Sequence, residues 1–311
     1  MKKLISVVTA AALTLSLYFL TGSATSDTAK KNDSSGINEF YDIIEYDYIT
    51  KTETRKTMRY SDEVLQAIRD GSELFSPGYT PDFIESDELL ETNGFRGWKK
   101  VDPTQSPHCK VIALRLGRDL TGAGGTPNAW ALGTGFMVGP KTLVTAGHNM
   151  WKPLWGTVQQ ARAYLKQNSS AFGSTYYLPH SWMYSPNYCN NNPDDNYDYC
   201  IINMQNNIGN TVGYFGYGTS NSLLGYFTAN NGYPNTDTYF QYLSFGEINS
   251  ETTFLCQSPA TATNGQSGGP VYTAANQIVY AIIRGGGPTH VTGVRISNTI
   301  YNEIAYMKSR P

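Results

Sequence analysis

Short runs of branched and aromatic residues, separated by clusters of turn-forming residues, constrain the fold of most of this chain. Four such runs cover residues 110–116, 129–138, 141–145 and 199–204, and Gly, Asn and Pro separate them. Runs of this length and spacing are typical of a β-barrel or β-sandwich. At the end of the chain the period changes, because apolar residues recur at helical spacing behind Ser297. We therefore expect strands followed by a C-terminal helix.

Composition excludes several other classes of protein. Charged residues make up 15% of the 311 residues and the net charge is −2, while Gly and Tyr number 30 and 23. Such a chain is not a disordered polyelectrolyte, a coiled coil or a collagen. It also lacks the basic excess of a nucleic-acid-binding protein, so we expect no nucleic-acid partner.

The N-terminus has the pattern of an export signal. Lys2 and Lys3 precede a mostly apolar stretch from Leu4 to Leu20, and residues 22–24 are the small residues Gly, Ser and Ala. We predict a signal peptide over residues 1–24 and a secreted, extracellular mature protein. A membrane anchor is the alternative, but the apolar stretch is short and is interrupted by Ser and Thr.

Residues 25–95 form an acidic segment with 7 Lys and Arg against 16 Asp and Glu, whereas residues 96–311 have 14 against 9. We interpret residues 25–95 as a prosegment that is cleaved between Glu88 and Lys100, and residues 96–311 as the functional domain. Ser61 and Gly71 predict the ends of a short helix within the segment. The alternative is an integral N-terminal domain, although its apolar residues are too few for an independent core.

All four cysteines fall in residues 96–311, at Cys109, Cys189, Cys200 and Cys256. An even number in an exported chain favours disulfides, and four cysteines allow three pairings. Cys189 and Cys200 flank one Asn- and Asp-rich loop and could pair locally, which would leave Cys109 with Cys256. The cysteines and histidines do not have the spacing of zinc ligands. Loop 190–195 could bind calcium through its oxygen atoms, but we expect it to be a solvated turn.

The strongest chemical signal is the glycine-rich turn Asn264-Gly-Gln-Ser-Gly-Gly-Pro270. A nucleophilic serine needs an exposed hydroxyl on a tight turn whose backbone N–H groups can hold an oxyanion, and Ser267 stands in such a turn. His148 ends an apolar strand among small residues and is the best candidate for the general base. Asp198 opens an apolar strand between aromatic residues and can orient the imidazole of His148. Asp194 and Asp195, in a polar loop, are better suited to a solvated role.

Chain order distinguishes two hydrolase folds. The turn also fits the nucleophile elbow of α/β-hydrolases, but those run in the order serine, acid, histidine. No Asp or Glu lies between Ser267 and His290, so that alternative fails. The order histidine, aspartate, serine is that of the two-barrel proteases.

From about residue 96 onward the chain resembles bacterial secreted chymotrypsin-like serine proteases, in particular the glutamyl endopeptidase group. The matching stretches are residues 133–148, 196–220 and 265–272. The resemblance implies an all-β fold of two perpendicular six-stranded antiparallel β-barrels, a trypsin-like serine protease domain over residues 96–311, and a catalytic triad of His148, Asp198 and Ser267. The backbone N–H groups of Gly265 and Ser267 would then form the oxyanion hole.

A serine protease of this kind needs no metal or organic cofactor. We expect protein or peptide substrates, the chain's own prosegment as a partner, no membrane association after signal removal, and a monomer. Gln266 stands where animal digestive proteases have an aspartate, so activation by a new N-terminus paired with that aspartate is excluded. An inactive protease-like binding protein and an esterase are the alternative functions.

Specificity for the residue before the scissile bond (P1) stays open at this stage. The resemblance points to acidic P1 residues, but Ile283 stands where a glutamyl endopeptidase has its carboxylate-binding histidine. The predicted walls of the P1 pocket comprise Thr261, Thr263, Ile283, Arg284, Gly285 and His290. Arg284 and His290 could hold a carboxylate, although neighbours on a strand face opposite ways and Arg284 can equally point away from the pocket. An apolar or small P1 residue is the alternative.

Overall fold

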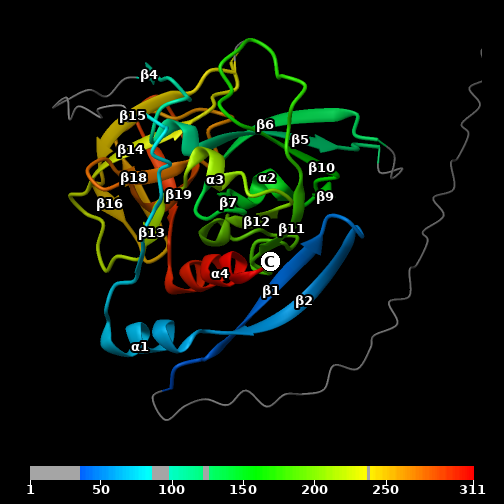
Figure 1. Cartoon of the computed structure of the whole chain (residues 1–311). Helices are drawn as coiled ribbons and strands as arrows, with labels where there is room; N and C mark the ends of the chain where they lie inside the picture. Colours follow the sequence, from blue (N-terminus) through cyan, green and yellow to red (C-terminus); the bar gives the residue numbers. More distant parts are fainter. Residues whose placement is uncertain (1–35, 86–97, 122–125, 237–238) are drawn as a thin grey trace, which may run out of the picture. The chain divides into compact units, whose positions relative to one another are not determined.

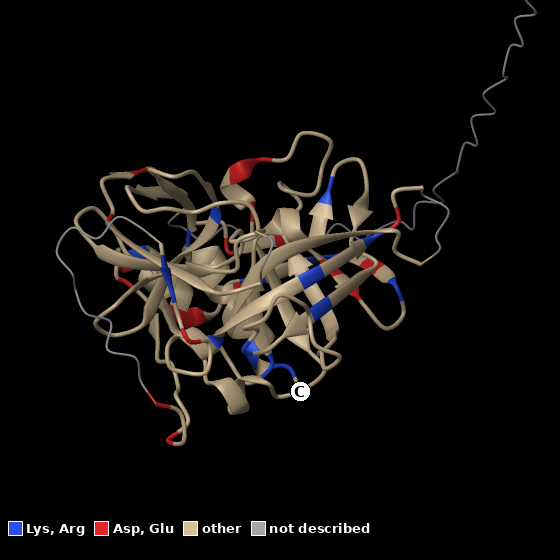
Figure 2. Ribbon diagram, turned by 90° about the horizontal axis from the view of Figure 1, so that it is seen from above, with Lys and Arg blue, Asp and Glu red and all other residues tan. Residues whose placement is uncertain are grey.

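The fold is known from a computed structural model, which describes residues 36–85, 98–121, 126–236 and 239–311. The predicted signal peptide, the ends of the predicted prosegment and most of the predicted cleavage region lie outside the described residues. Residues 39–311 form a single unit (Figure 1). Charged residues occupy little of its ribbon, as expected from the composition (Figure 2). Among the described helices, none is both long and apolar enough to cross a membrane.

Sheet A is an eight-stranded antiparallel sheet in the order β10-β5-β6-β7-β12-β11-β1-β2. Its strands are β1 (Phe40–Asp47), β2 (Thr52–Arg59), β5 (Val111–Arg118), β6 (Ala129–Met137), β7 (Thr142–Thr145), β10 (Gln160–Tyr164), β11 (Pro179–Tyr184) and β12 (Cys200–Met204). Four of them confirm the strand positions expected from the sequence. Both faces of β5 are buried, which explains why its sequence lacks a polar alternation.

Sheet B has ten strands: eight follow the order β16-β17-β20-β19-β18-β14-β15-β4, β13 pairs with β19, and β3 pairs with β13. Its strands are β3 (Phe75–Ser76), β4 (Lys99–Lys100), β13 (Gly216–Gly218), β14 (Phe227–Gly232), β15 (Tyr242–Glu247), β16 (Ser250–Glu251), β17 (Leu255–Ser258), β18 (Pro270–Thr273), β19 (Ile278–Gly286) and β20 (Val291–Arg295). Except for the parallel pair β13–β19, the paired strands are antiparallel.

Short elements connect the strands. They are the helical turns η1 (His108–Lys110), α2 (Gly147–Met150), η2 (Asp195–Tyr197) and α3 (Gly209–Val212), and the hairpin of β8 (Trp151–Lys152) and β9 (Gly156–Thr157). One buried cluster contains side chains of both sheets, among them Val111 and Phe136 from sheet A and Tyr272 and Val279 from sheet B. The two sheets therefore share a core.

The described part of the predicted prosegment contributes to this fold. The β1–β2 hairpin extends sheet A, with Ile44 of β1 opposite Tyr184 of β11, and Ile43 is completely buried. Helix α1 (Asp62–Asp70) confirms the expected ends, because the Ser61 hydroxyl accepts a hydrogen bond from the Val64 N–H and Gly71 adopts φ 65°. The segment's apolar side chains pack into cores that the rest of the chain supplies.

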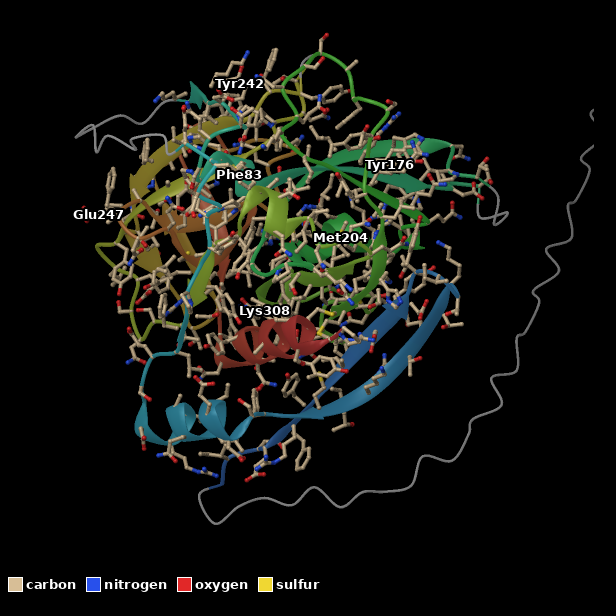
Figure 3. The ribbon with its side chains drawn as sticks, viewed as in Figure 1. Phe83, Tyr176, Met204, Tyr242, Glu247 and Lys308 are labelled. Atoms are coloured by element: carbon tan, nitrogen blue, oxygen red, sulfur yellow. The ribbon has the colours of Figure 1, made fainter. Side chains whose placement is uncertain are left out.

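The C-terminal helix is also confirmed. Helix α4 (Asn298–Ser309) begins after Ser297, whose side chain accepts a hydrogen bond from the Ile300 N–H at 3.3 Å. Figure 1 shows α4 between α1 and the strands β7 and β12, and Lys308, labelled in Figure 3, donates a hydrogen bond to the Ser76 hydroxyl at 3.1 Å. Helix α4 thus links the N-terminal segment to the two sheets.

Candidate active site

Strand pairing brings His148 and Asp198 together. Strands β7 and β12 are neighbours in sheet A with Thr145 opposite Cys200, so the chain leaves β7 where it enters β12. His148 follows β7 within α2, and Asp198 precedes β12 by two residues. Fifty residues of sequence therefore separate two side chains that the sheet places at the same edge.

The Asp198 carboxylate holds the histidine by two hydrogen bonds. The His148 backbone N–H donates to Oδ1 at 2.7 Å, and the ring Nδ1 lies 2.8 Å from Oδ2. The Asp198 side chain is 3% exposed, whereas that of His148 is 26% exposed. Gly147 allows this approach, because a Cβ there would lie 3.1 Å from Asp198 Oδ1 and 2.9 Å from the Tyr188 ring. A buried carboxylate thus orients a partly exposed imidazole.

Ser267 lies on a turn whose backbone conformation requires glycine at two positions. Gly265 and Gly268 have φ angles of +94° and +87°, and a Cβ on Gly268 would lie 2.1 Å from the Thr134 carbonyl oxygen. The Ser267 hydroxyl donates a hydrogen bond to the Arg284 carbonyl at 3.1 Å. Ser267 and His148 line the same cavity of about 720 Å³. Ser267 thus faces the same cavity as His148, whose ring contacts Asp198.

The N–H groups predicted to bind an oxyanion are available. Among the described residues, the N–H groups of Gly265 and Ser267 make no hydrogen bond, and both residues line the cavity. Gln266 between them is completely buried, and its Oε1 accepts a hydrogen bond from the Thr263 N–H at 3.0 Å. The turn thus presents two free donors beside the serine hydroxyl.

Two positioning residues were missed by the sequence reasoning. The Thr134 N–H and the Asn149 side-chain amide donate to the Ser267 carbonyl at 2.9 and 2.8 Å. The Thr134 hydroxyl also donates to the Gly265 carbonyl at 2.8 Å. The only sequence signal for Asn149 is that it directly follows His148. These bonds connect the histidine segment to the serine turn.

Arg284 does not face the predicted P1 pocket. Its Nη2 forms an ion pair with the Asp195 carboxylate, and its Nε lies 3.9 Å from Asp198 Oδ2. Asp195 is therefore an ion-pair partner, and its side chain is 56% exposed, which agrees with the solvated position expected for it. Arg284 thus lies beside Asp198, the proposed catalytic aspartate. Its positive charge partly neutralises the negative charges of the Asp195 and Asp198 carboxylates.

The other predicted pocket residues form two adjacent segments. The Ala262 N–H donates to the Gly287 carbonyl at 3.1 Å, and the Thr261 hydroxyl donates to the Pro288 carbonyl at 2.9 Å. These bonds place Thr261 and Thr263 next to the end of β19, which contains Gly285. Ile283 is completely buried, and His290 is exposed in the turn between β19 and β20.

The expected disulfides are absent, because all four cysteines are free thiols. Cys109 packs in a core cluster of sheet A, whereas Cys256 packs in a separate cluster of sheet B. Cys189 packs against the same sheet A cluster that contains Cys200, but no bond joins the two. The pairing of Cys109 with Cys256 is wrong because the two residues belong to different cores, which spacing along the chain could not show.

Loop 190–195, considered as a possible calcium site, is organised by internal hydrogen bonds. An Asp194 carboxylate oxygen accepts a hydrogen bond from the Asn196 N–H at 3.0 Å, and the side-chain oxygen of Asn190 accepts one from the Asn192 N–H at 2.8 Å. Across the described ranges of the chain, no three His, Cys, Asp or Glu side chains gather in a group able to hold a metal ion.

Comparison with curated proteins finds relatives among bacterial proteases. The chain is 33% identical over 185 residues to a Bacillus subtilis protein named extracellular metalloprotease, covering 56% of this chain and 57% of that protein. It is 31% identical over 195 residues to the glutamyl endopeptidase of Bacillus licheniformis, covering 57% of this chain and 59% of that enzyme. The matched regions thus span less than two thirds of these relatives.

Solved structures share the fold. A Glu endopeptidase determined in complex with MPD superposes with a TM-score of 0.60 at 22% identity, over 70% of this chain and 99% of that one. The protease Anisep from Arthrobacter nicotinovorans gives a TM-score of 0.54 at 17% identity, over 67% of this chain and 99% of that one. These likenesses establish the chymotrypsin-like fold, which confirms the fold class expected from the sequence.

Residues 133–281 match the family model described as a trypsin-like peptidase domain. This range begins in β6, ends in β19, and contains His148, Asp198 and Ser267. Sequence, fold and relatives therefore agree: the chain has the chymotrypsin-like fold, and residues 133–281 resemble a trypsin-like peptidase domain.

Proposed function

We propose that this protein is a secreted serine endopeptidase in which Ser267 is the nucleophile, His148 the general base and Asp198 the residue that orients it. The observation that carries the proposal is the double hydrogen bond from His148 to the buried Asp198 carboxylate, beside a serine hydroxyl in the same cavity. Because Nδ1 faces Asp198, Nε2 is the nitrogen left to take the serine proton.

The proposed reaction begins with rotation of the Ser267 hydroxyl away from the Arg284 carbonyl, its hydrogen-bond acceptor in the structure. His148 then takes the proton while the serine oxygen attacks the scissile carbonyl. The developing oxyanion accepts hydrogen bonds from the Gly265 and Ser267 N–H groups, each worth about 3–4 kcal/mol in comparable enzymes. His148 protonates the leaving amine, and water then hydrolyses the acyl-enzyme by the same steps.

A fluorophosphonate probe tests this assignment, because it labels only an activated serine. We expect stoichiometric labelling of the protein at Ser267, no labelling of the Ser267→Ala variant, and cleavage of peptides as well as esters. Absence of labelling in a folded protein would favour the inactive binding protein, and cleavage of esters alone would favour the esterase.

For the P1 residue, the geometry favours a small or apolar side chain. Arg284 is engaged by two carboxylates, and Ala262 and Ile283 are buried apolar residues beside the serine turn. Acidic P1 recognition has one basic side chain left among the predicted pocket residues, the exposed His290, and the name of the Bacillus licheniformis relative favours that alternative. A panel of peptides that differ only in a P1 Ala, Leu, Glu or Lys, repeated with His290→Ala, separates the two.

We also propose that residues 1–24 direct secretion and that residues 25–95 are removed during maturation by cleavage between Glu88 and Lys100. Within the described residues, Glu45 of β1 forms an ion pair with Arg310 near the C-terminus, and β1 pairs with β11 along apolar residues. Salt should weaken the first contact but not the second. Intact mass and N-terminal sequencing of the secreted protein give the cleavage point, and full activity of an uncleaved precursor would refute the zymogen.

A further inference from the structure

The cavity at the proposed active site extends away from the predicted P1 pocket. It is about 720 Å³ in volume and is lined by His148, Gly265 and Ser267, but its described lining contains none of the residues predicted to bind P1. Its other walls come from β5, β6 and the segment after α2. Because His148 must protonate the leaving amine, the part of a peptide that follows the scissile bond would enter here.

Three cations line this cavity, namely Arg115, Arg118 and Lys152, and its described lining contains no Asp or Glu. Arg118 is 7% exposed and donates hydrogen bonds to the Asn149 and Gly156 carbonyls at 2.9 and 3.0 Å. Burial lowers the pKa of Arg118 to about 10, so the side chain stays charged at neutral pH. Burial, and next the charge of Arg118, lower the pKa of Lys152.

A further cation adds to the charge at the same edge of sheet A. Arg162 of β10 lies directly opposite Arg115 of β5, and their guanidinium carbons lie 4.7 and 4.6 Å from the centre of the Trp130 ring. Arg162 also lies 4.6 Å from the ring of Tyr176, which Figure 3 labels beside these strands. Like charges directly opposite on neighbouring strands repel. Within the described ranges neither arginine has a carboxylate partner, so this arrangement lacks a counter-charge.

Aromatic rings complete the walls. The cavity is lined by Trp130, Trp155, Phe172 and Tyr239, and the last two rings pack with centroids 4.2 Å apart. When an aromatic ring holds a guanidinium group in place, the N–H donors of that group stay free to bind an anion. The rings also shield the resulting ion pair from water. The result is a preorganised site with positive charge and partly apolar walls.

We propose that this cavity binds acidic side chains located just after the scissile bond, so that the protease prefers substrates with Asp or Glu at the first and second leaving-group positions (P1′ and P2′). The inference rests on the proposed function and adds a substrate class to it. It assigns the acidic preference to the leaving-group side, whatever the P1 residue is.

Matched peptides test the preference. Three peptides share the sequence up to and including the P1 residue and then continue with Asp-Glu, Asn-Gln or Lys-Lys. We expect kcat/KM to be about five- to tenfold higher for Asp-Glu than for Asn-Gln, as two partly exposed ion pairs allow, and lowest for Lys-Lys. The preference should weaken between low and high salt, because the charges are near the surface.

Two variants locate the preference in the cavity. Arg115→Gln and Lys152→Gln should each reduce the ratio of kcat/KM between the Asp-Glu and Asn-Gln peptides to about twofold. The matched control is Lys141→Gln, because Lys141 is a partly exposed lysine outside the cavity lining. This control should keep the ratio of the unaltered protein. Fluorophosphonate titration gives the concentration of active sites for every variant.

The possible failures are distinguishable. Full labelling and cleavage with equal rates for the Asp-Glu and Asn-Gln peptides would overturn the acidic preference and leave the proposed function standing. The same holds if the preference survives in both Arg115→Gln and Lys152→Gln. A folded protein that is neither labelled nor active would overturn both proposals.

Discussion

Replacing Glu303 by glutamine should stabilise the protein at neutral and alkaline pH. Helix α4 places this side chain in the interior with 1% exposure. Its Oε1 accepts a hydrogen bond from the Tyr199 hydroxyl at 3.2 Å, and Oε2 has no hydrogen-bond partner among the described residues. Burial raises the pKa of Glu303 to about 8, so the folded protein holds this proton at pH 7.

The expected magnitude follows from the difference between the pKa of Glu303 in the folded protein and its pKa in the unfolded chain. In the unfolded chain the same carboxyl titrates near its ordinary pKa of 4.5. Between pH 4.5 and about 8 only the folded state binds the proton, so the free energy of unfolding falls by about 1.4 kcal/mol for each pH unit. Over the whole interval the loss is on the order of 5 kcal/mol. Below pH 4.5 both states are protonated and the loss disappears.

Urea unfolding at pH 5, 6, 7 and 8.5 measures this dependence, with Ser267→Ala as the background to prevent self-digestion. The stability difference between Glu303→Gln and the background should grow with pH, because glutamine does not titrate. Glu247→Gln is the matched control, since Glu247 lies exposed at the end of β15 (Figure 3). If the Glu303→Gln and Glu247→Gln curves run parallel to that of the background, the buried neutral carboxyl is refuted.

Four further outcomes are expected at the active site and the thiols. Asp198→Asn should lower kcat by about 10⁴-fold through the wrong imidazole tautomer, and a loss under tenfold in steady-state assays would contradict its role. Arg284→Ala should lower kcat on the order of tenfold for all P1 residues alike, whereas a selective loss of Glu substrates would show that it binds P1. Asn149→Ala should lower kcat more than it raises KM, by on the order of tenfold, because the Ser267 carbonyl loses a hydrogen bond; an unchanged kcat would contradict this. Titration with a thiol reagent should detect four free cysteines in the unfolded protein and fewer in the folded one. Detection of none after unfolding without reductant would show that the four cysteines form disulfides.

The local features of this protein could be predicted from the sequence because their causes are local. Ser61 and Gly71 stop helix α1 by a side-chain cap and a left-handed backbone, and both signals occupy single positions. The order of His148, Asp198 and Ser267 excluded one hydrolase fold without any coordinates. The tight turn around Ser267 could be predicted from its glycines for the same reason, since the φ angles at Gly265 and Gly268 favour a residue without a Cβ.

Contacts between distant segments were decided by the tertiary structure alone. The ion pair between Asp195 and Arg284 joins two segments far apart along the chain, and the role of the Asn149 amide is visible only beside the Ser267 carbonyl. The possible pairing of Cys109 with Cys256 fails because chain spacing does not tell which core a side chain enters. The positive cavity depends on the register that places Arg115 opposite Arg162. A side chain's neighbours across a sheet are set by strand pairing, and strand pairing joins residues that the linear sequence keeps far apart.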